Sequence, residues 1–281
     1  MSFGKDLSEE FQKLTFGAVF DEVSLFTKLQ DAFINLKSVA KYKYAVEVIH
    51  GHTSLVEFQF NSSWTSKIPY GNTVRRELSD MLFVLYSLKN NTIRISYMQN
   101  KKGVSSDKFK ADLCQLHLLS QRERIISKPL PECLFGDPDI LSHASLPSVG
   151  SYGVFYQLGD RTEMAYYPAE LLHPKQATGD SVVRVVTYNQ RSFDRVLIHK
   201  GIEENQGTRC LMDFGNALAK MQIGTPINRS MSIYEQLGRF LLVHVADIKE
   251  SNLFPQSLNT SPDKEIVSVP VTVAINVDRI F

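Results

Sequence analysis

The N-terminal part of the chain carries apolar residues at helical spacing. Phe26, Leu29 and Phe33 recur at steps of three and four positions, which is the spacing of one face of an α-helix. Gly17 interrupts an earlier part of the same pattern. We therefore predict two consecutive helices within Leu7–Val39.

Apolar segments further along the chain predict the strands of a sheet. Residues alternate in character along Ser54–Phe60, whereas Met81–Tyr86 is apolar at every position, which is typical of a central strand covered on both faces. Lys89–Asn91 predicts a tight turn that leads into a strand at Ile93–Met98. We predict further strands at Tyr42–His50, Gly153–Gln157, Val182–Tyr188 and Glu265–Ile275, and further helices at Asp107–Arg124, Gly215–Gln222 and Ser232–Val245.

This order of elements predicts a mixed α/β protein. The stretch 129–150 is rich in proline and glycine and is the best candidate for a boundary between regions. We therefore divide the chain into a core at residues 1–130 and a C-terminal α/β region at residues 131–281. The role of the second region stays open, and it is either a separate domain or integrated with the core.

Composition narrows the class of protein further. Hydrophobic residues make up 43% and charged residues 22% of the 281 positions, which excludes global disorder and a coiled-coil rod. The net charge is +1, so the whole chain gives no signal for nucleic acid, but residues 101–130 hold seven basic and three acidic side chains. The sequence shows no apolar run of roughly 18 residues and no paired cysteine motif, and we expect no signal peptide. We expect a cytoplasmic protein without membrane association.

Three polar residues lie where a hairpin would bring them together. Asp80 precedes the apolar strand, and Gln99 and Lys101 close the next one, on one face because strand side chains alternate. A carboxylate and an amide oxygen suit Mg²⁺, with Mn²⁺ as an alternative. Lys101 could orient a water and offset negative charge. These residue types favour phosphodiester hydrolysis.

This arrangement resembles the PD-(D/E)xK nuclease superfamily, in its Gln-x-Lys variant, and looks like an uncharacterised bacterial subgroup of restriction-endonuclease-like proteins. Asp80 matches the motif's Asp and Gln99-Asn100-Lys101 its second half, while Ser79 stands where the family has proline. The resemblance implies a restriction-endonuclease-like core, a mixed central sheet flanked by helices, followed here by the C-terminal α/β extension.

The resemblance also implies an activity and partners. We expect a Mg²⁺-dependent DNA endonuclease of bacterial restriction or antiphage defence, working with a defence-system partner protein. Because each such site cuts one strand, cleavage of both strands favours a homodimer. Three alternatives stay open. The first is a nuclease with the same site that acts on RNA or on a special nucleic-acid structure. The second is an inactive nuclease-fold module that binds nucleic acid or supports assembly, which the neutral Gln99 allows, and the third is another α/β protein without the predicted hairpin.

A second acid would strengthen a metal site that has a neutral amide as one ligand. Glu77 is the favoured candidate, because a helical turn would put it on the same side as Asp80. It could equally pair with the neighbouring arginines. Glu57 is the next candidate, followed by Glu22 and Glu47, and we interpret Glu22 as a solvated helix residue.

Basic residues beside the motif are candidates for binding the nucleic-acid backbone. Arg75 and Arg76 could clamp phosphates or could equally be solvated surface residues. Lys102, Lys108 and Lys110 would extend a positive track beside the site. Such contacts add salt-dependent affinity without sequence information.

Overall fold

The structure is a computed structural model, and it describes residues 2–37, 42, 44–48, 55–61, 70–127, 139–177, 182–187, 195–244, 253–254 and 271–280. The helices are α1 (Phe3–Thr15), α2 (Glu22–Lys37), α3 (Leu113–Gln121), α4 (Leu211–Ala219) and α5 (Ser232–His244), with short 3-10 turns η1 (Pro147–Val149), η2 (Ala169–Leu171) and η5 (Val277–Arg279). The strands are β1 (Tyr44–Val48), β2 (Leu55–Phe60), β3 (Asn72–Glu77), β4 (Met81–Ser87), β5 (Thr92–Ser105), β6 (Lys108–Asp112), β7 (Ile125–Ser127), β8 (Gly150–Leu158), β9 (Arg161–Pro168), β10 (Leu172–Ala177), β11 (Val182–Thr187), β12 (Val196–His199), β13 (Ile202–Asn205), β14 (Thr225–Pro226) and β15 (Val271–Asn276).

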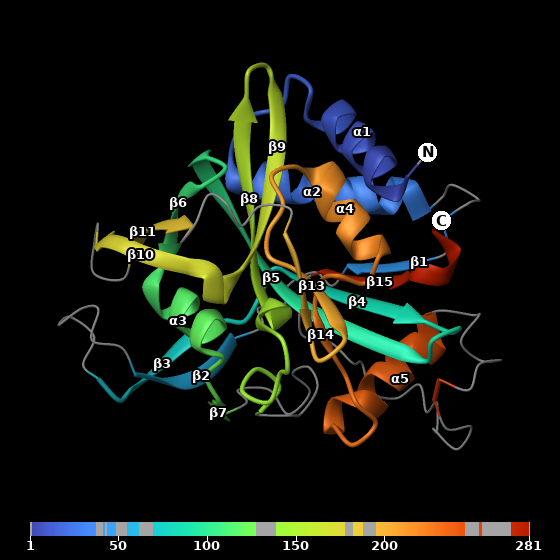
Figure 1. Ribbon diagram of the computed structural model, residues 1–281. Helices are drawn as coiled ribbons and strands as arrows, with labels where there is room; N and C mark the ends of the chain where they lie inside the picture. The colour runs from blue at the N-terminus through green and yellow to red at the C-terminus, as the bar shows by residue number, and fades with distance from the viewer. Residues whose placement is uncertain are drawn as a thin grey trace.

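A mixed sheet runs through the molecule (Figure 1). Ten of the described strands form it, in the order β1-β15-β4-β5-β6-β11-β10, with β14 and β8 also paired to β5 and β9 paired to β8. The pairs β4–β15 and β5–β8 are parallel, and β4–β5 is antiparallel. The predicted mixed α/β class is therefore confirmed.

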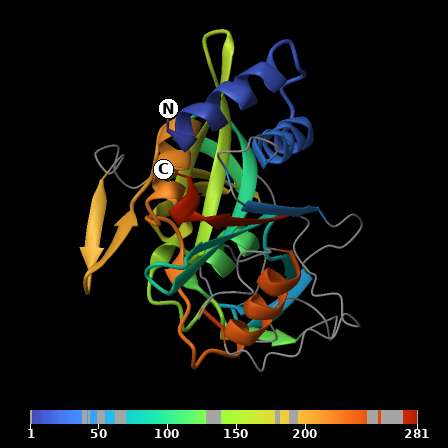
Figure 2. The same ribbon diagram turned by 90° about the vertical axis from the view of Figure 1, so that its right-hand side faces the viewer.

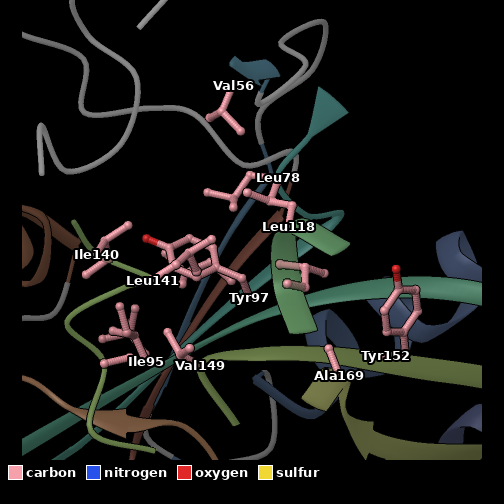
Figure 3. Packing of buried hydrophobic residues seen from close by; sticks show 14 of the residues in the cluster. Val56, Leu78, Ile95, Tyr97, Leu118, Ile140, Leu141, Val149, Tyr152 and Ala169 are labelled. Carbon is pink, nitrogen blue, oxygen red and sulfur yellow. The ribbon is translucent and has the colours of Figure 1, made fainter. Parts of the chain in front are cut away.

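The two faces of the sheet carry two separate hydrophobic clusters. Leu82, Val84 and Tyr86 of β4 belong to one cluster, whereas Met81, Phe83 and Leu85 belong to the other, as the two-residue period of a strand requires. Helices α3 and α5 pack on the first face, and α1, α2 and α4 pack on the second. The helical layers are seen on either side of the sheet in Figure 2, and part of the first cluster is drawn in Figure 3. Burial on both faces explains why β4 has no polar residue before Ser87.

Strand β5 joins three parts of the sheet. Its first half pairs with β4, residues 97–102 pair in parallel with β8, and its last residues pair with β6. The connection from β5 to β8 carries α3, which covers the strand pair from one face. The middle of β5, near residues 97–99, is consequently the place where β4, β8 and α3 converge.

The sheet combines strands from both ends of the chain. Strand β15 pairs with β4, and β8 pairs with β5, so strands before and after the stretch 129–150 lie side by side. Residues 128–138 of that stretch lie outside the described residues.

The predicted helix Asp107–Arg124 is wrong in its first part. Lys108–Asp112 is strand β6, in which Lys108 and Lys110 are exposed while Phe109 is buried. The helix begins only after Asp112, whose carboxylate accepts a hydrogen bond from the Gln115 N–H at 2.9 Å and so forms the N-cap. The two-residue alternation before Asp112 was the local signal for a strand.

Other predicted elements are confirmed with shifted ends. Gly17 separates α1 from α2, and the strand predicted at Ile93–Met98 continues to Ser105. The helix predicted from Gly215 begins at Leu211 and ends at Ala219. Among the described helices, none has the length and apolar character needed to cross a membrane.

Two glycines allow α1 and α4 to pack closely. A methyl group added at Gly215 would lie 2.6 Å from the Gly4 Cα and 3.3 Å from Leu7 Cδ2. Such distances are too short for carbon atoms, so the contact requires a residue without a side chain at this point of α4.

We predict that Gly215→Ala lowers the free energy of unfolding by about 2 kcal/mol, because the helices must separate to admit the methyl group. This cost exceeds the roughly 1 kcal/mol that alanine gains over glycine in a helix. Urea denaturation checks the prediction, with Gln121→Ala at an exposed position of α3 as the control. A Gly215→Ala protein as stable as the wild type would contradict the close packing.

Candidate metal centre

Asp80 is held at the start of β4 by hydrogen bonds to both neighbouring strands. Its N–H donates to the Met98 carbonyl at 3.1 Å, and its carbonyl accepts from the Val271 N–H at 3.3 Å. The Asn100 N–H donates to the Oδ2 atom of Asp80 at 2.6 Å. The backbone and the carboxylate of Asp80 are therefore both fixed in position by the sheet.

The Gln99 side chain is fully buried beside this carboxylate. When its NH₂ group faces Asp80, Nε2 lies 3.1 Å from Oδ2 and 3.3 Å from Oδ1. Its Oε1 then accepts from the Ser79 N–H at 3.2 Å and from Gln115 Nε2 at 2.7 Å. In this orientation every polar group of the amide has a hydrogen-bond partner, and the NH₂ group of Gln99 stabilises the Asp80 carboxylate by hydrogen bonding.

The same spacing suits a shared cation when the amide is turned by 180°. The amide oxygen would then lie 3.1 and 3.3 Å from the two carboxylate oxygens. Adjacent ligands of an octahedral Mg²⁺ at about 2.1 Å are about 3 Å apart. Asp80 and Gln99 would then be adjacent oxygen ligands, but the turned NH₂ group would face two donors, the Ser79 N–H at 3.2 Å and Gln115 Nε2 at 2.7 Å, so without a cation the amide favours the first orientation.

Lys101 lies at the same site and is engaged by an acid from α2. Its Nζ lies 3.0 Å from Glu22 Oε1, and the second carboxylate oxygen of Glu22 accepts from the Lys102 N–H at 3.0 Å. Glu22 is a helix residue whose side chain is 42% exposed, as interpreted, and it is in addition paired with Lys101. Its position at the first turn of α2 was indicated by the sequence, but its partner on β5 is distant in the chain.

Glu77 reaches the site from the end of a strand and not from a helical turn. Residues Asn72–Glu77 form β3, which pairs with β2 through Glu77 itself, so the predicted helical turn is wrong. The pKa of Glu77 is raised to about 7, mainly by burial and in addition by the negative charge of Asp80, while Lys101 acts in the opposite direction. The bend after β3 brings Glu77 close enough to Asp80 for the two charges to interact.

Asp80 is in a similar electrostatic position. Part of the residue reaches the surface, but protein surrounds its carboxylate on most sides. Burial raises its pKa, while Lys101 and the hydrogen bond from the Asn100 N–H act in the opposite direction. The negative charge of Glu22 also raises it. A cation at this site would therefore stabilise several carboxylates at once.

The remaining acids proposed from the sequence lie elsewhere or are not described. Glu57 of β2 lies opposite Arg75 in the register of β2 with β3. The backbone of Glu47 is in β1, but its side chain lies outside the described part of the structure.

The two arginines before the motif differ in their surroundings. Arg75 is exposed on β3. Arg76 donates through Nε to Asp112 Oδ1 at 2.9 Å, and its NH1 group donates to the Arg75 carbonyl at 2.7 Å. Arg76 thus ties β3 to the N-cap of α3, a contact that stabilises the surroundings of the site.

The three lysines proposed as a positive track lie on β5 and β6. Lys102 is exposed and its Nζ lies 4.8 Å from the centre of the Phe20 ring. Lys108 and Lys110 occupy exposed positions of β6, which continues from the end of β5. Because side chains alternate along a strand and Phe109 lies in the cluster on the α3 face, the three lysines lie on the face of the sheet opposite to Tyr97 and Gln99.

Gln115 belongs to the site and was missed from the sequence. It is a buried polar residue of α3, and its Nε2 donates to the Glu77 carbonyl at 3.1 Å besides contacting Gln99. A glutamine at a buried position of the apolar run Leu113–Leu119 is the signal that could have identified it.

Among the described residues, no three His, Cys, Asp or Glu side chains are grouped closely enough to hold a metal ion. Mg²⁺ is usually bound through one or two carboxylates together with waters and substrate phosphates, and Asp80 and Glu77 are the carboxylates that interact at this place. No family model, curated protein or solved structure matches this chain.

We predict that Glu77→Gln removes a pH-dependent loss of stability. The folded-state pKa of Glu77, about 7, lies above the ordinary value of 4.5, so its stabilising protonation is lost as the pH rises through about 7. The free energies of unfolding of Glu77→Gln and wild type are compared in EDTA. Between pH 5 and pH 8 their difference should change in favour of the variant by about 1 kcal/mol, a value lowered to allow for solvent screening. Chemical denaturation at both pH values checks this. The control is Glu9→Gln, which changes an acid at an exposed position of α1. An equal difference at both pH values would sink the prediction.

Proposed function

We propose that the protein is a Mg²⁺-dependent endonuclease that hydrolyses phosphodiester bonds of DNA. The observation that carries the proposal is the spacing of 3.1 and 3.3 Å between the Gln99 amide and the Asp80 carboxylate. Lys101 interacts electrostatically with Asp80 from the same site. A carboxylate, an amide and a lysine in one place are the groups that this chemistry needs.

The arrangement of elements supports a restriction-endonuclease-like core. The antiparallel hairpin β4–β5 carries Asp80 at the start of its first strand and Gln99 and Lys101 in its second. Helix α2 precedes the hairpin and α3 follows it, as the family resemblance implies. This agreement concerns only the order of helices and strands, which does not determine the function.

Each residue has a distinct role in this proposal. Asp80 and Gln99 hold the cation, and Glu77 adds negative charge beside them. When bound, Mg²⁺ lowers the pKa of a water and offsets charge that develops on the phosphate. Lys101 donates to the phosphate or to the attacking water, which requires its Nζ to leave Glu22 or to share it.

Substrate contacts follow from the exposed basic residues. Arg75, Lys102, Lys108 and Lys110 would bind backbone phosphates, and Arg76 contributes charge while it remains paired with Asp112. Such binding is independent of sequence. Cleavage of both strands would use a homodimer, and a cytoplasmic role in bacterial restriction or antiphage defence with a partner protein follows from the family resemblance.

We predict that Lys101→Ala lowers kcat for nicking of supercoiled DNA in Mg²⁺ by about 10²-fold or more, because a charge that acts in the transition state is lost. Lys102→Ala, one residue away and directed toward Phe20, is the matched control. It should leave kcat nearly unchanged and raise KM in a salt-dependent manner. EDTA should abolish cleavage by all three proteins.

The same assay separates the competing functions. Cleavage of RNA or of flaps in preference to duplex DNA would favour the nuclease with another substrate. DNA binding without cleavage in Mg²⁺ or Mn²⁺ would favour the inactive binding module, which the buried amide at position 99 permits. Cleavage that survives in Lys101→Ala would contradict the assigned site.

We predict that Gln99→Glu tightens Mg²⁺ binding by about 10-fold, because a carboxylate is a better ligand than an amide. Without metal, the variant should be less stable than wild type at pH 8, since a third acid would lie beside Asp80 and Glu77. Isothermal titration with Mg²⁺ and thermal melting in EDTA measure the two effects. Gln99→Glu with unchanged Mg²⁺ affinity would show that position 99 is not a ligand.

A further inference from the structure

Backbone N–H groups at one edge of β5 donate to carboxylates in place of a neighbouring strand. Strand β4 pairs with β5 only as far as Met98, and β8 lies along the other edge of the residues that follow. Alternate residues of a strand direct their N–H groups to the same edge. The Asn100 N–H donates to Asp80 Oδ2 at 2.6 Å. The Lys102 N–H, next on this edge, donates to Glu22 Oε2 at 3.0 Å.

Glu22 is held through both of its carboxylate oxygens. Its Oε1 lies 3.0 Å from Lys101 Nζ, while its Oε2 accepts from the Lys102 N–H. An ammonium group and a backbone N–H that meet the two oxygens of one carboxylate form a site for an anion with two adjacent oxygens. A backbone phosphate of nucleic acid is such an anion, and proteins bind it with lysines and with backbone N–H groups.

The carboxylate of Glu22 is not needed to begin its own helix. The Ser24 N–H donates to Asp21 Oδ1 at 2.9 Å, and the Leu25 N–H donates to the Asp21 carbonyl at 3.1 Å, so Asp21 provides the cap of α2. The side chain of Glu22 is 42% exposed, and ion pairs at the surface contribute little to stability. The contact with β5 can therefore open while the helix stays intact.

The place that Glu22 occupies adjoins the candidate metal centre. Lys101 interacts electrostatically with both Asp80 and Glu77. The N–H groups that bind Asp80 and Glu22 are two residues apart on one edge, which is about 7 Å along a strand. A phosphate bound in place of Glu22 would consequently lie beside the carboxylate of Asp80.

We propose that Glu22 is an autoinhibitory residue, whose carboxylate occupies a phosphate site made of Lys101 Nζ and the Lys102 N–H and is displaced when a backbone phosphate of nucleic acid binds there. The inference rests on the proposed function, to which it adds a specific phosphate site and its competitor. Only the fraction of molecules with an open site binds, so a carboxylate that fills the site for about nine-tenths of the time weakens binding about 10-fold.

The test compares Glu22→Gln with Asp31→Asn in the full chain. Each variant removes one negative charge from α2, but Asp31 pairs with Lys28 of the same helix at 3.9 Å. Fluorescence anisotropy with a short DNA duplex in EDTA measures binding without cleavage. Glu22→Gln should bind the duplex about 10-fold more tightly than wild type, whereas Asp31→Asn should change the affinity by less than about 2-fold. Both variants should melt close to wild type, because Asp21 still caps α2.

A second comparison assigns the effect to the shared site. In a Lys101→Ala background, Glu22→Gln should tighten duplex binding by less than about 2-fold, because the ammonium group for which the two anions compete is absent. In Mg²⁺, Glu22→Gln should lower KM for supercoiled DNA. A titration with inorganic phosphate alone tests whether the site prefers a free anion.

Three results would overturn the inference. Duplex binding by Glu22→Gln may be no tighter than that of wild type, and a lower kcat would then show that Glu22 positions Lys101. A gain in affinity that persists in the Lys101→Ala background would reflect general charge. Tighter binding of inorganic phosphate without tighter binding of the duplex would assign the site to a free anion.

The outcomes also separate this inference from the proposed function. If Glu22→Gln tightens duplex binding through Lys101 but the wild type cleaves no nucleic acid in Mg²⁺ or Mn²⁺, the proposed function fails and the inference stands. If cleavage depends on Lys101 but Glu22→Gln does not bind more tightly, the inference fails and the proposed function stands. If neither wild type nor Glu22→Gln binds or cleaves nucleic acid, both are overturned.

Discussion

The hydrogen bonds that fix Asp80 between β5 and β15 are the constraint on which the site depends. They place its carboxylate against Asn100 N–H and beside the Gln99 amide. One of these strands comes from the hairpin partner and the other from the C-terminal end of the chain. The position of Asp80 thus depends on the complete sheet, and the residues after 150 contribute to the site by holding it.

The chemistry of the site follows from an imbalance of charge. Asp80 interacts with Glu77, Glu22 and Lys101, and burial raises the pKa of both Asp80 and Glu77. One lysine cannot compensate for three carboxylates in such surroundings. Taking up a proton would relieve the imbalance, and so would the proposed divalent cation, which would compete best at neutral pH or above, where protons are scarce.

The sequence predicted the part of this site that is local. Asp80, Gln99 and Lys101 come together because a short antiparallel hairpin has a register that its turn determines, and the apolar run Met81–Tyr86 marked its first strand. Glu22 and Gln115 could not be placed in this way, since α2 and α3 reach β5 through tertiary packing. The strand β6 was misread as helix because the apolar residues of the adjoining helix dominated the pattern.

A glutamine at position 99 has a physical consequence for folding without metal. A carboxylate there would face Asp80 across about 3 Å in a buried site, and the repulsion would have to be relieved by protonation or by opening of the strands. The amide can instead donate to Asp80 while accepting from Ser79 and Gln115, so that the site folds completely in the absence of a cation. Binding of the proposed cation would require the amide to turn its NH₂ group toward the Ser79 N–H and Gln115 Nε2, and the energy of the lost hydrogen bonds would be subtracted from the metal affinity. The proposed site would therefore be preformed and of modest affinity, in contrast to a tighter site that would form only together with its cation.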